Sequence, residues 1–282
     1  MSILITVNMY SGVQNPSWEL SNDEAEELKK LLSSEHSMST SSSPSSSGIL
    51  GYRGFEVTAL DEPNIPNKSL LFDGIIDFGE NDQSNFVDQN SVVEKFLLST
   101  GKNVLDNEEF AHIDEEIVKN SDGGIANSMK DFQIMAVPPY NPSKWNNNPT
   151  VKRNNNCYNY ANDKITNTFA QPGRGSGQVG PFPPSCSGTG SAAERDGQIP
   201  VSSASSTPSE GQFIALVIWP GRDYHWYRLD SNAMWSHKPG QTAAKNTDNS
   251  GQLITDPKEC NRGPYSSWCG YYHCIPSQTR IR

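Results

Sequence analysis

The sequence has little positive charge and no long hydrophobic run. Its 282 residues include 22 Lys and Arg against 32 Asp and Glu, which gives a net charge of −10. Binding to nucleic acid requires clustered basic residues that displace counterions from phosphates, so no nucleic-acid partner is expected. No segment reaches the roughly 18 consecutive apolar residues of a membrane-spanning helix, so no membrane span is expected. The N-terminal residues also show no signal peptide.

The composition favours a loop-rich α+β protein. Only 34% of the residues are hydrophobic, while the chain has 22 Gly and 19 Pro, so short elements joined by turns are expected. A chain of this length lies near the size at which a single core stops growing, so two domains are expected. We place a small N-terminal α+β domain at residues 1–135, a Pro-rich connector at 136–149 and a second domain at 150–282.

The N-terminal domain shows secondary-structure patterns but no catalytic motif. Ser21 and Glu24 form a capping-box pattern that predicts a helix start, and the Ser-rich stretch 33–48 predicts a surface insertion. His36 and His112 are interpreted as solvated surface residues. Strands are predicted at residues 3–10, 52–60 and 70–78, and a further helix is predicted at 91–99.

A cysteine with the setting of a nucleophile opens the second domain. Asn155 or Asn156 can cap a helix that begins at or beside Cys157. The partial positive charge of a helix N-terminus favours a thiolate, so the pKa of Cys157 is expected to be lowered. An inert, packed cysteine would give the same local sequence, because Cys is often buried.

Two histidines follow in a predicted antiparallel meander. Residues 211–240 divide into three strands, with turns at Pro220–Gly221 and near residues 230–232. His225 opens the second strand and His237 ends the third, so the two side chains can be cross-strand neighbours. A nucleophile needs a base, and the base needs a group that fixes its tautomer, roles that His225 and His237 could fill.

Together these residues resemble the NlpC/P60 and CHAP-type peptidases and amidases of the papain-like class. In that family a Cys opens a helix, a His opens the second strand of the following sheet, and a second polar residue closes the third strand. The resemblance covers roughly residues 150–240. It implies a Cys157–His225–His237 triad that hydrolyses amide bonds of peptide or peptidoglycan-like substrates, with no cofactor.

Two further questions are which residues bind substrate and whether the protein is an enzyme. Tyr227 shares a strand face with His225 and Asn156 precedes the nucleophile, so both are expected to bind substrate. The alternative is a non-enzymatic secreted binding or toxin-like protein on the same scaffold, because a fold does not guarantee an activity.

The four other cysteines lie in loop-like sequence. We expect two disulfides among them, with Cys157 free, and a location outside the cell depends on this pairing. Five free thiols in the cytoplasm are the alternative. A metal site that includes His273 is a third option, but its spacing matches no zinc pattern, and no metal is expected. The four cysteines are Cys186, Cys260, Cys269 and Cys274.

Overall fold

The computed structural model divides the chain into two compact units. Unit 1 comprises Met1–Met9, Asn15–Ser46 and Tyr52–Ile125, and unit 2 comprises Tyr10–Gln14, Ser47–Gly51 and Ala126–Arg282. Both units combine helices with an antiparallel sheet, so the protein is of the α+β class. The structure describes residues 2–35, 39–40, 44, 49–60, 65–79, 85–120, 137–178, 184–204 and 208–282.

A seven-stranded antiparallel sheet forms the centre of unit 1. Along β1, buried Ile3, Ile5 and Val7 alternate with more exposed residues, because successive strand side chains point to opposite faces. The predicted strand at 70–78 is in fact a hairpin with its turn at Asp73–Gly74. The strand order is β2 (Ser17–Glu19), β1 (Ser2–Val7), β4 (Phe55–Leu60), β5 (Lys68–Phe72), β6 (Ile75–Asp77), β7 (Asn85–Val87) and β3 (Ser39–Thr40).

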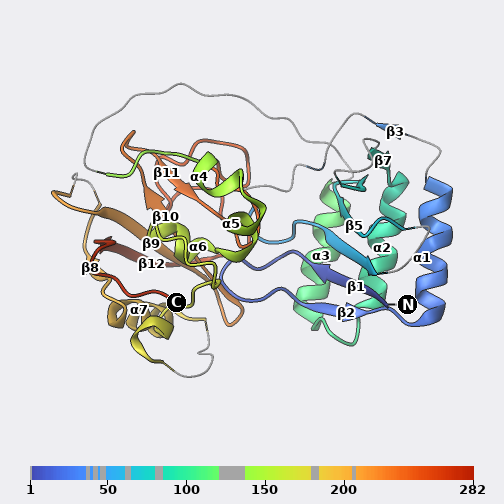
Figure 1. Ribbon diagram of the computed structural model, residues 1–282, viewed down its shortest axis with the longest axis horizontal. Helices are drawn as coiled ribbons and strands as arrows, with labels where there is room; N and C mark the ends of the chain where they lie inside the picture. Colours follow the sequence, from blue (N-terminus) through green and yellow to red (C-terminus); the bar gives the residue numbers. More distant parts are fainter. Residues whose placement is uncertain are drawn as a thin grey trace. The chain divides into compact units, whose positions relative to one another are not determined.

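The described part of unit 1 also has three α-helices, which run side by side (Figure 1). The helices are α1 (Asn22–Glu35), α2 (Val92–Thr100), preceded by the short η1 (Gln89–Ser91), and α3 (Asn107–Asn120). The capping box at the start of α1 is confirmed, because Glu24 accepts from the Ser21 backbone N–H at 2.8 Å. His112 lies on α3 and is half-buried rather than solvated, and burial lowers its pKa. His36 and most of the Ser-rich stretch lie outside the described residues.

A buried carboxyl group gives unit 1 a pH-dependent stability. Glu94 accepts hydrogen bonds from the Tyr52 hydroxyl at 2.7 Å and the Gly74 N–H at 3.2 Å, yet burial raises its pKa to about 7. A carboxyl whose pKa is higher in the folded state binds its proton more tightly there, so stability falls as pH rises from the unfolded value toward 7.

We therefore expect the unfolding free energy of unit 1 to fall between about pH 4.5 and 7, by roughly 3 kcal/mol from this group. In Glu94→Gln this pH dependence should be flatter, because the side chain no longer titrates. Urea unfolding followed at several pH values measures the slope, and exposed Glu108→Gln serves as the control. An unchanged slope in Glu94→Gln would show that this carboxyl is not the titrating group.

A five-stranded sheet organises unit 2. The strand order is β11 (Trp235–His237), β10 (Asp223–Leu229), β9 (Gln212–Trp219), β12 (Ser267–Cys274) and β8 (Ile199–Val201). The predicted meander is therefore present as β9, β10 and β11. The aromatic-rich segment after residue 265 forms strand β12, which lies between β9 and β8. Strand β9 is buried along its whole length, because it has a neighbour on each side and both of its faces are covered.

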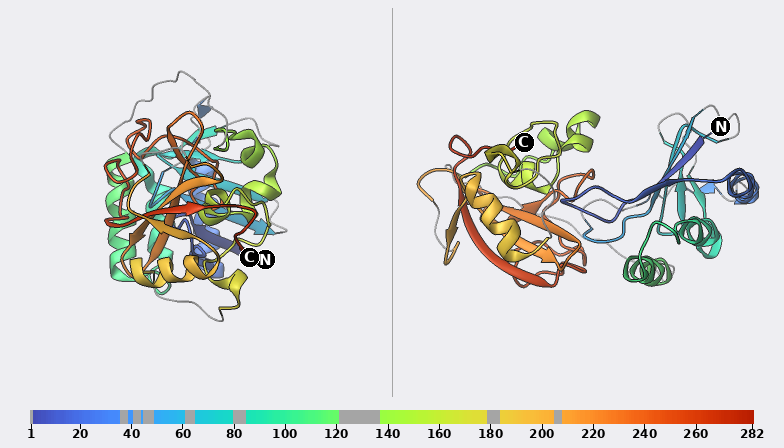
Figure 2. Two further views of the ribbon diagram at one scale, coloured as in Figure 1. Left: turned by 90° about the vertical axis from the view of Figure 1, so that its left-hand side faces the viewer. Right: turned by 90° about the horizontal axis from the view of Figure 1, so that it is seen from below.

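Helices α6 (Cys157–Ala161) and α7 (Cys186–Arg195) cover one face of this sheet. Tyr158 and Ala161 of α6 and Ala193 of α7 share a core cluster with Leu216 of β9 and Trp226 of β10. Figure 2 shows α7 lying along the sheet. Cys186, which we placed in loop-like sequence, is the first residue of α7, and Ser185 caps this helix by accepting from the Gly188 N–H at 3.0 Å.

The predicted connector also contains structure. Helix α4 (Ser143–Asn146) buries Trp145 against Tyr160, with ring centroids 5.2 Å apart, so this segment is part of unit 2. Helix α5 (Pro149–Asn154) and the short η2 (Arg174–Ser176) follow along the chain. Among the described residues, none of the helices combines the length and the apolar character that crossing a membrane would require.

Candidate functional site

Cys157 is the first residue of helix α6, as predicted. Asn156 is the N-cap, and its side-chain oxygen accepts from the backbone N–H groups of Tyr158 and Asn159, each at 3.1 Å. The Asn159 side chain accepts in return from the Asn156 N–H at 3.1 Å, which completes a capping box. The helix start is therefore fixed by asparagines on both sides of the thiol.

The thiol lies against the strand segment that carries His225. Its Sγ is 3.8 Å from the carbonyl oxygen of Tyr224 and also contacts the backbone N–H of Trp226. Cys157 has no exposed surface. Burial raises the pKa of the thiol well above its usual range, and the nearby charge of Asp223 raises it further. The predicted lowering of this pKa is wrong, because loss of hydration outweighs the effect of a helix of five residues.

The two histidines meet as predicted. His225 Nε2 lies 3.0 Å from His237 Nδ1, and His237 Nε2 lies 2.9 Å from the carbonyl oxygen of Thr247. A carbonyl can only accept, so His237 donates to it from Nε2 and accepts from His225 at Nδ1. This assignment places the lone pair of a neutral His225 on its Nδ1, the nitrogen that could accept a proton. Thr247 was not predicted and fixes the tautomer of the pair.

Aromatic rings enclose the histidine pair. Tyr227 stacks on His237 with centroids 5.1 Å apart, and its ring meets that of His225 edge-on at 4.8 Å. Tyr265 approaches His225 at 5.9 Å. Tyr227 is only 1% exposed, so its predicted place in an open substrate cleft is wrong. Its side chain is a packing group that holds His237.

Residues Tyr10–Gln14 belong to unit 2 and pack next to this site. The carboxylate of Asp223 accepts from three successive backbone N–H groups, those of Ser11, Gly12 and Val13. It also accepts from the hydroxyl of Tyr265. Burial raises the pKa of Asp223 to about 6, although the hydrogen bonds lower it. We call Ser11–Val13 the covering segment.

The carbonyl oxygen of Gly12 is bound by three side chains. Asn156 Nδ2 donates to it at 3.2 Å, Gln171 Nε2 at 2.8 Å and the Tyr224 hydroxyl at 3.2 Å. Asn156 is fully buried, so it holds the covering segment rather than binding substrate, and that prediction is corrected. Asp223 and Gln171 were missed, because their partner lies more than 150 residues away in the sequence.

A buried lysine fixes the chain just before Cys157. The Nζ of Lys238, which follows His237, donates to the carbonyl oxygens of Lys152 at 2.6 Å and Gly240 at 2.7 Å, and to that of Asn155. Lys238 has no exposed surface. The end of β11 and the entry to α6 are thereby tied together, which places the histidine pair and the thiol in one region of unit 2.

One of the two expected disulfides is present. Cys186 and Cys269 are bonded across 83 residues, with their Cα atoms 5.1 Å apart, and the bond joins α7 to β12. Cys157 is free, as predicted. The second disulfide is not formed, because Cys274 is buried in the core and Cys260 instead contacts the hydroxyl of Tyr227 at 3.9 Å. The alternative metal site loses Cys269 to the disulfide, and the described residues contain no cluster with three or more possible metal ligands.

Removing this disulfide should cost stability. In the chain-entropy account, a crosslink across 83 residues adds about 4.5 kcal/mol to the unfolding free energy. We expect that loss in a Cys186→Ser/Cys269→Ser variant, measured by urea unfolding, and little change in Cys260→Ser. Peptide mapping without reductant should recover Cys186 joined to Cys269. Recovery of any other cysteine pair would contradict the connectivity.

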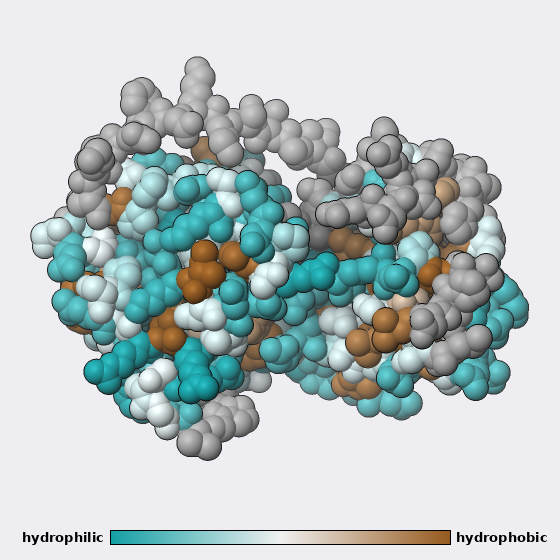
Figure 3. All heavy atoms as spheres, viewed as in Figure 1, coloured by the Kyte–Doolittle hydropathy of each residue, from teal (hydrophilic) through white to brown (hydrophobic). Residues whose placement is uncertain are grey.

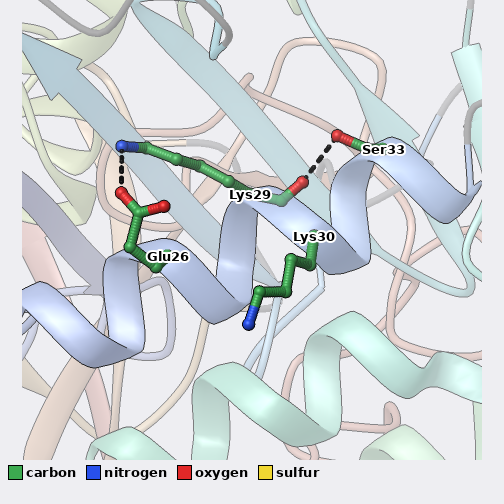
Figure 4. A pocket seen from close by; sticks show the side chains of 4 residues that line it. All are labelled: Glu26, Lys29, Lys30 and Ser33. Atoms are coloured by element: carbon green, nitrogen blue, oxygen red, sulfur yellow. Dashed lines mark hydrogen bonds and ion pairs between the residues drawn. The ribbon is translucent and has the colours of Figure 1, made fainter.

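A hollow on the surface of α1 offers no comparable chemistry. It is lined by Glu26, Lys29, Lys30 and Ser33. Lys29 bonds to Glu26 at 2.9 Å, and the Ser33 hydroxyl donates to the carbonyl oxygen of Lys29 (Figure 4). Lys30 pairs with Glu27 at 3.2 Å. The charged side chains that line this hollow are paired along a single helix. The group of residues around Cys157 therefore remains the candidate site.

Comparison with known proteins gives one informative relative. No protein-family model and no solved structure matches the chain. Insoluble matrix shell protein 1 of Ruditapes philippinarum is 50% identical over 135 residues, which is 47% of this chain and 86% of the relative. An identity of 50% over 86% of the relative's length indicates that the two proteins share a common ancestor. The chain therefore belongs to the family of insoluble matrix shell protein 1.

Proposed function

We propose that this protein is a structural component of an insoluble extracellular matrix. The observation that carries the proposal is the 50% identity to a protein described as an insoluble matrix protein of shell. The disulfide between Cys186 and Cys269 fits a location outside the cell, because such bonds persist in oxidising compartments.

The geometry of unit 2 supports a role that is structural rather than catalytic. Cys157 and His225 have no exposed surface and His237 is 1% exposed. Burial holds the thiol in its protonated form, whereas a nucleophile must reach the thiolate. In this arrangement the buried polar groups serve packing and internal hydrogen bonding.

Fractionation of the source organism tests the matrix role. We expect the protein in the extracellular residue that resists extraction with detergent, identified there by its own peptides. A cytosolic enzyme of known location and a soluble secreted protein serve as controls. Recovery of the protein mainly in the soluble intracellular fraction would refute the proposal.

A second function, hydrolysis of amide bonds in peptide or peptidoglycan-like substrates, has its own support. The bond between His225 and His237 and the position of Cys157 at a capped helix start are the parts such an enzyme needs. The thiol proton would pass to His225, the sulfur would attack the substrate carbonyl, and the amine would leave with that proton. Water would then release the acid from the thioester. This chemistry requires the covering segment to move away.

Hydrolysis can be tested separately from the matrix role. Purified protein is incubated with peptide and peptidoglycan fragments, and released amines are measured for the wild type, Cys157→Ala and Cys274→Ala. Turnover that is lost in Cys157→Ala and in His225→Ala but kept in Cys274→Ala supports an enzyme. The absence of turnover, including after partial release of the covering segment, would refute it.

A further inference from the structure

The charge of the chain is divided unequally between its two units. Unit 1 contains 7 Lys and Arg against 22 Asp and Glu, a net charge of −15. Unit 2 contains 15 against 10, a net charge of +5. The overall charge of −10 therefore conceals an acidic unit and a basic one. Charge asymmetry of this kind indicates an electrostatic partner.

Four arginines from three separate segments of the sequence come together in unit 2. The N–H of Gln171 donates to the carbonyl oxygen of Arg282 at 2.9 Å, and the backbone of Gly175 lies against that of Arg280. The N–H of Arg280 donates to the carbonyl oxygen of Asp196 at 2.8 Å. We call the four the arginine patch: Arg174, Arg195, Arg280 and Arg282.

All four members of the arginine patch are exposed. The carboxylate of Asp196 does not neutralise them, because it is turned inward and accepts from the Gly173 N–H at 2.7 Å and the Ser176 hydroxyl at 2.8 Å. Arg195 donates to the neutral side chain of Gln178. In Figure 3, strongly hydrophilic side chains gather over the region of α7 and the chain end. Guanidinium groups presented in this way bind carboxylates well.

Unit 1 presents a matching acidic surface on helix α3. This helix carries five acidic residues and one lysine. Glu108, Asp114 and Glu115 are exposed, and the only basic side chain of the helix, Lys119, already pairs with Glu116 at 2.9 Å. On α1, in contrast, both lysines are paired with glutamates, so its acidic character is weaker.

We propose that the arginine patch of one copy binds the acidic surface of α3 on a second copy. The two surfaces are different and each copy has both, so a single contact between two copies is heterologous and leaves one surface of each kind for a further copy. A heterologous contact extends into an open chain when its rotation does not close, and we infer the open form here. This inference deepens the proposed matrix role, because open assembly gives an insoluble product.

Self-association should depend on salt and on the arginine patch. Sedimentation velocity of the full chain is expected to show concentration-dependent assembly at about 0.01 M salt and its loss at about 1 M, where charges are screened. Arg174→Gln/Arg280→Gln should weaken association by about tenfold or more. Arg153→Gln/Lys258→Gln, which removes the same charge from exposed positions outside the patch, should associate as the wild type.

Mixing two reversed variants identifies the partner surface. Arg174→Glu/Arg280→Glu and Asp114→Lys/Glu115→Lys should each fail to assemble alone, whereas an equimolar mixture should form complexes. Circular dichroism and thermal unfolding confirm that each variant is folded. A wild type that is monomeric at both salt concentrations would overturn the inference, as would a patch variant that assembles normally.

Two other outcomes distinguish failure of self-assembly from failure of the proposed matrix role. If the patch binds an anionic polymer such as heparin but the chain stays monomeric, the partner is not a second copy, and the inference is overturned. If the protein fractionates with the extracellular residue yet does not self-associate in solution, the matrix role stands and only this assembly mode fails.

Discussion

Replacement of Gly12 by alanine is expected to lower the unfolding free energy of unit 2 by about 3 kcal/mol, because overpacking forces neighbouring atoms apart. A Cβ at this position would lie 2.5 Å from the ring of Tyr224 and 2.7 Å from its carbonyl oxygen. The backbone of β10 cannot move away without breaking its pairing with β9. Urea unfolding followed by tryptophan fluorescence measures the change.

The control for Gly12 is Gly221→Asn. Gly221 sits in the turn between β9 and β10, where an added Cβ would meet nothing within 4 Å. Its φ of +72° is left-handed, a conformation that asparagine tolerates better than most residues. We expect a change below about 1 kcal/mol there. Equal stability of Gly12→Ala and the wild type would mean that the covering segment does not pack tightly in solution.

Replacement of Asp223 by asparagine should expose Cys157 to reagents. The carboxylate accepts from three backbone N–H groups and one hydroxyl, whereas an amide has one acceptor oxygen and turns an NH₂ toward those donors. Each buried donor left without a partner costs roughly 1–3 kcal/mol. If the free energy that favours the closed covering segment falls by about 3 kcal/mol, the rate at which iodoacetamide alkylates the thiol should rise about 100-fold.

Asp248→Asn provides a matched control for this measurement. Asp248 also accepts from three backbone N–H groups, those of Ser250, Gln252 and Asn261, but it does so near the surface. Water can replace the lost acceptor there, so alkylation of Cys157 should stay at the slow wild-type rate. Fast alkylation in the wild type would contradict a buried thiol. Equal alkylation rates in Asp223→Asn and Asp248→Asn would show that Asp223 has no special role in keeping Cys157 covered.

The sequence predicted local features where short-range rules act. The capping box at Ser21, the helix start at Cys157 and the meander of β9 to β11 are each determined by residues within a few positions of one another. The pairing of His225 with His237 followed from the meander, because the turn between β10 and β11 determines which side chains meet.

Long-range contacts account for the missed parts. Nothing near Gly12 in the sequence indicates that Asp223 will bind it, and the burial of Cys157 depends on a core assembled from separate segments. Helix α7 was missed because Gly and Ser dominate its first turns, while Ala192 and Ala193 find their core only in the folded unit. Cys260 and Cys274 could not be excluded as partners without the positions of their strands and loops.

The position of β12 in the sheet has a consequence for folding during synthesis. Residues 267–274 follow β9 by almost fifty positions and pair with both β9 and β8, so the sheet is incomplete until they have left the ribosome. Residues 11–13 precede Asp223 by more than 200 positions, and their N–H groups find this acceptor only after it has been synthesised. Unit 2 can therefore close only after residues 267–274 have been synthesised, and such distant pairing slows folding. Until then, the nascent chain carries an unpaired β9 edge and a reduced Cys186, both of which are targets for chaperones and thiol oxidases.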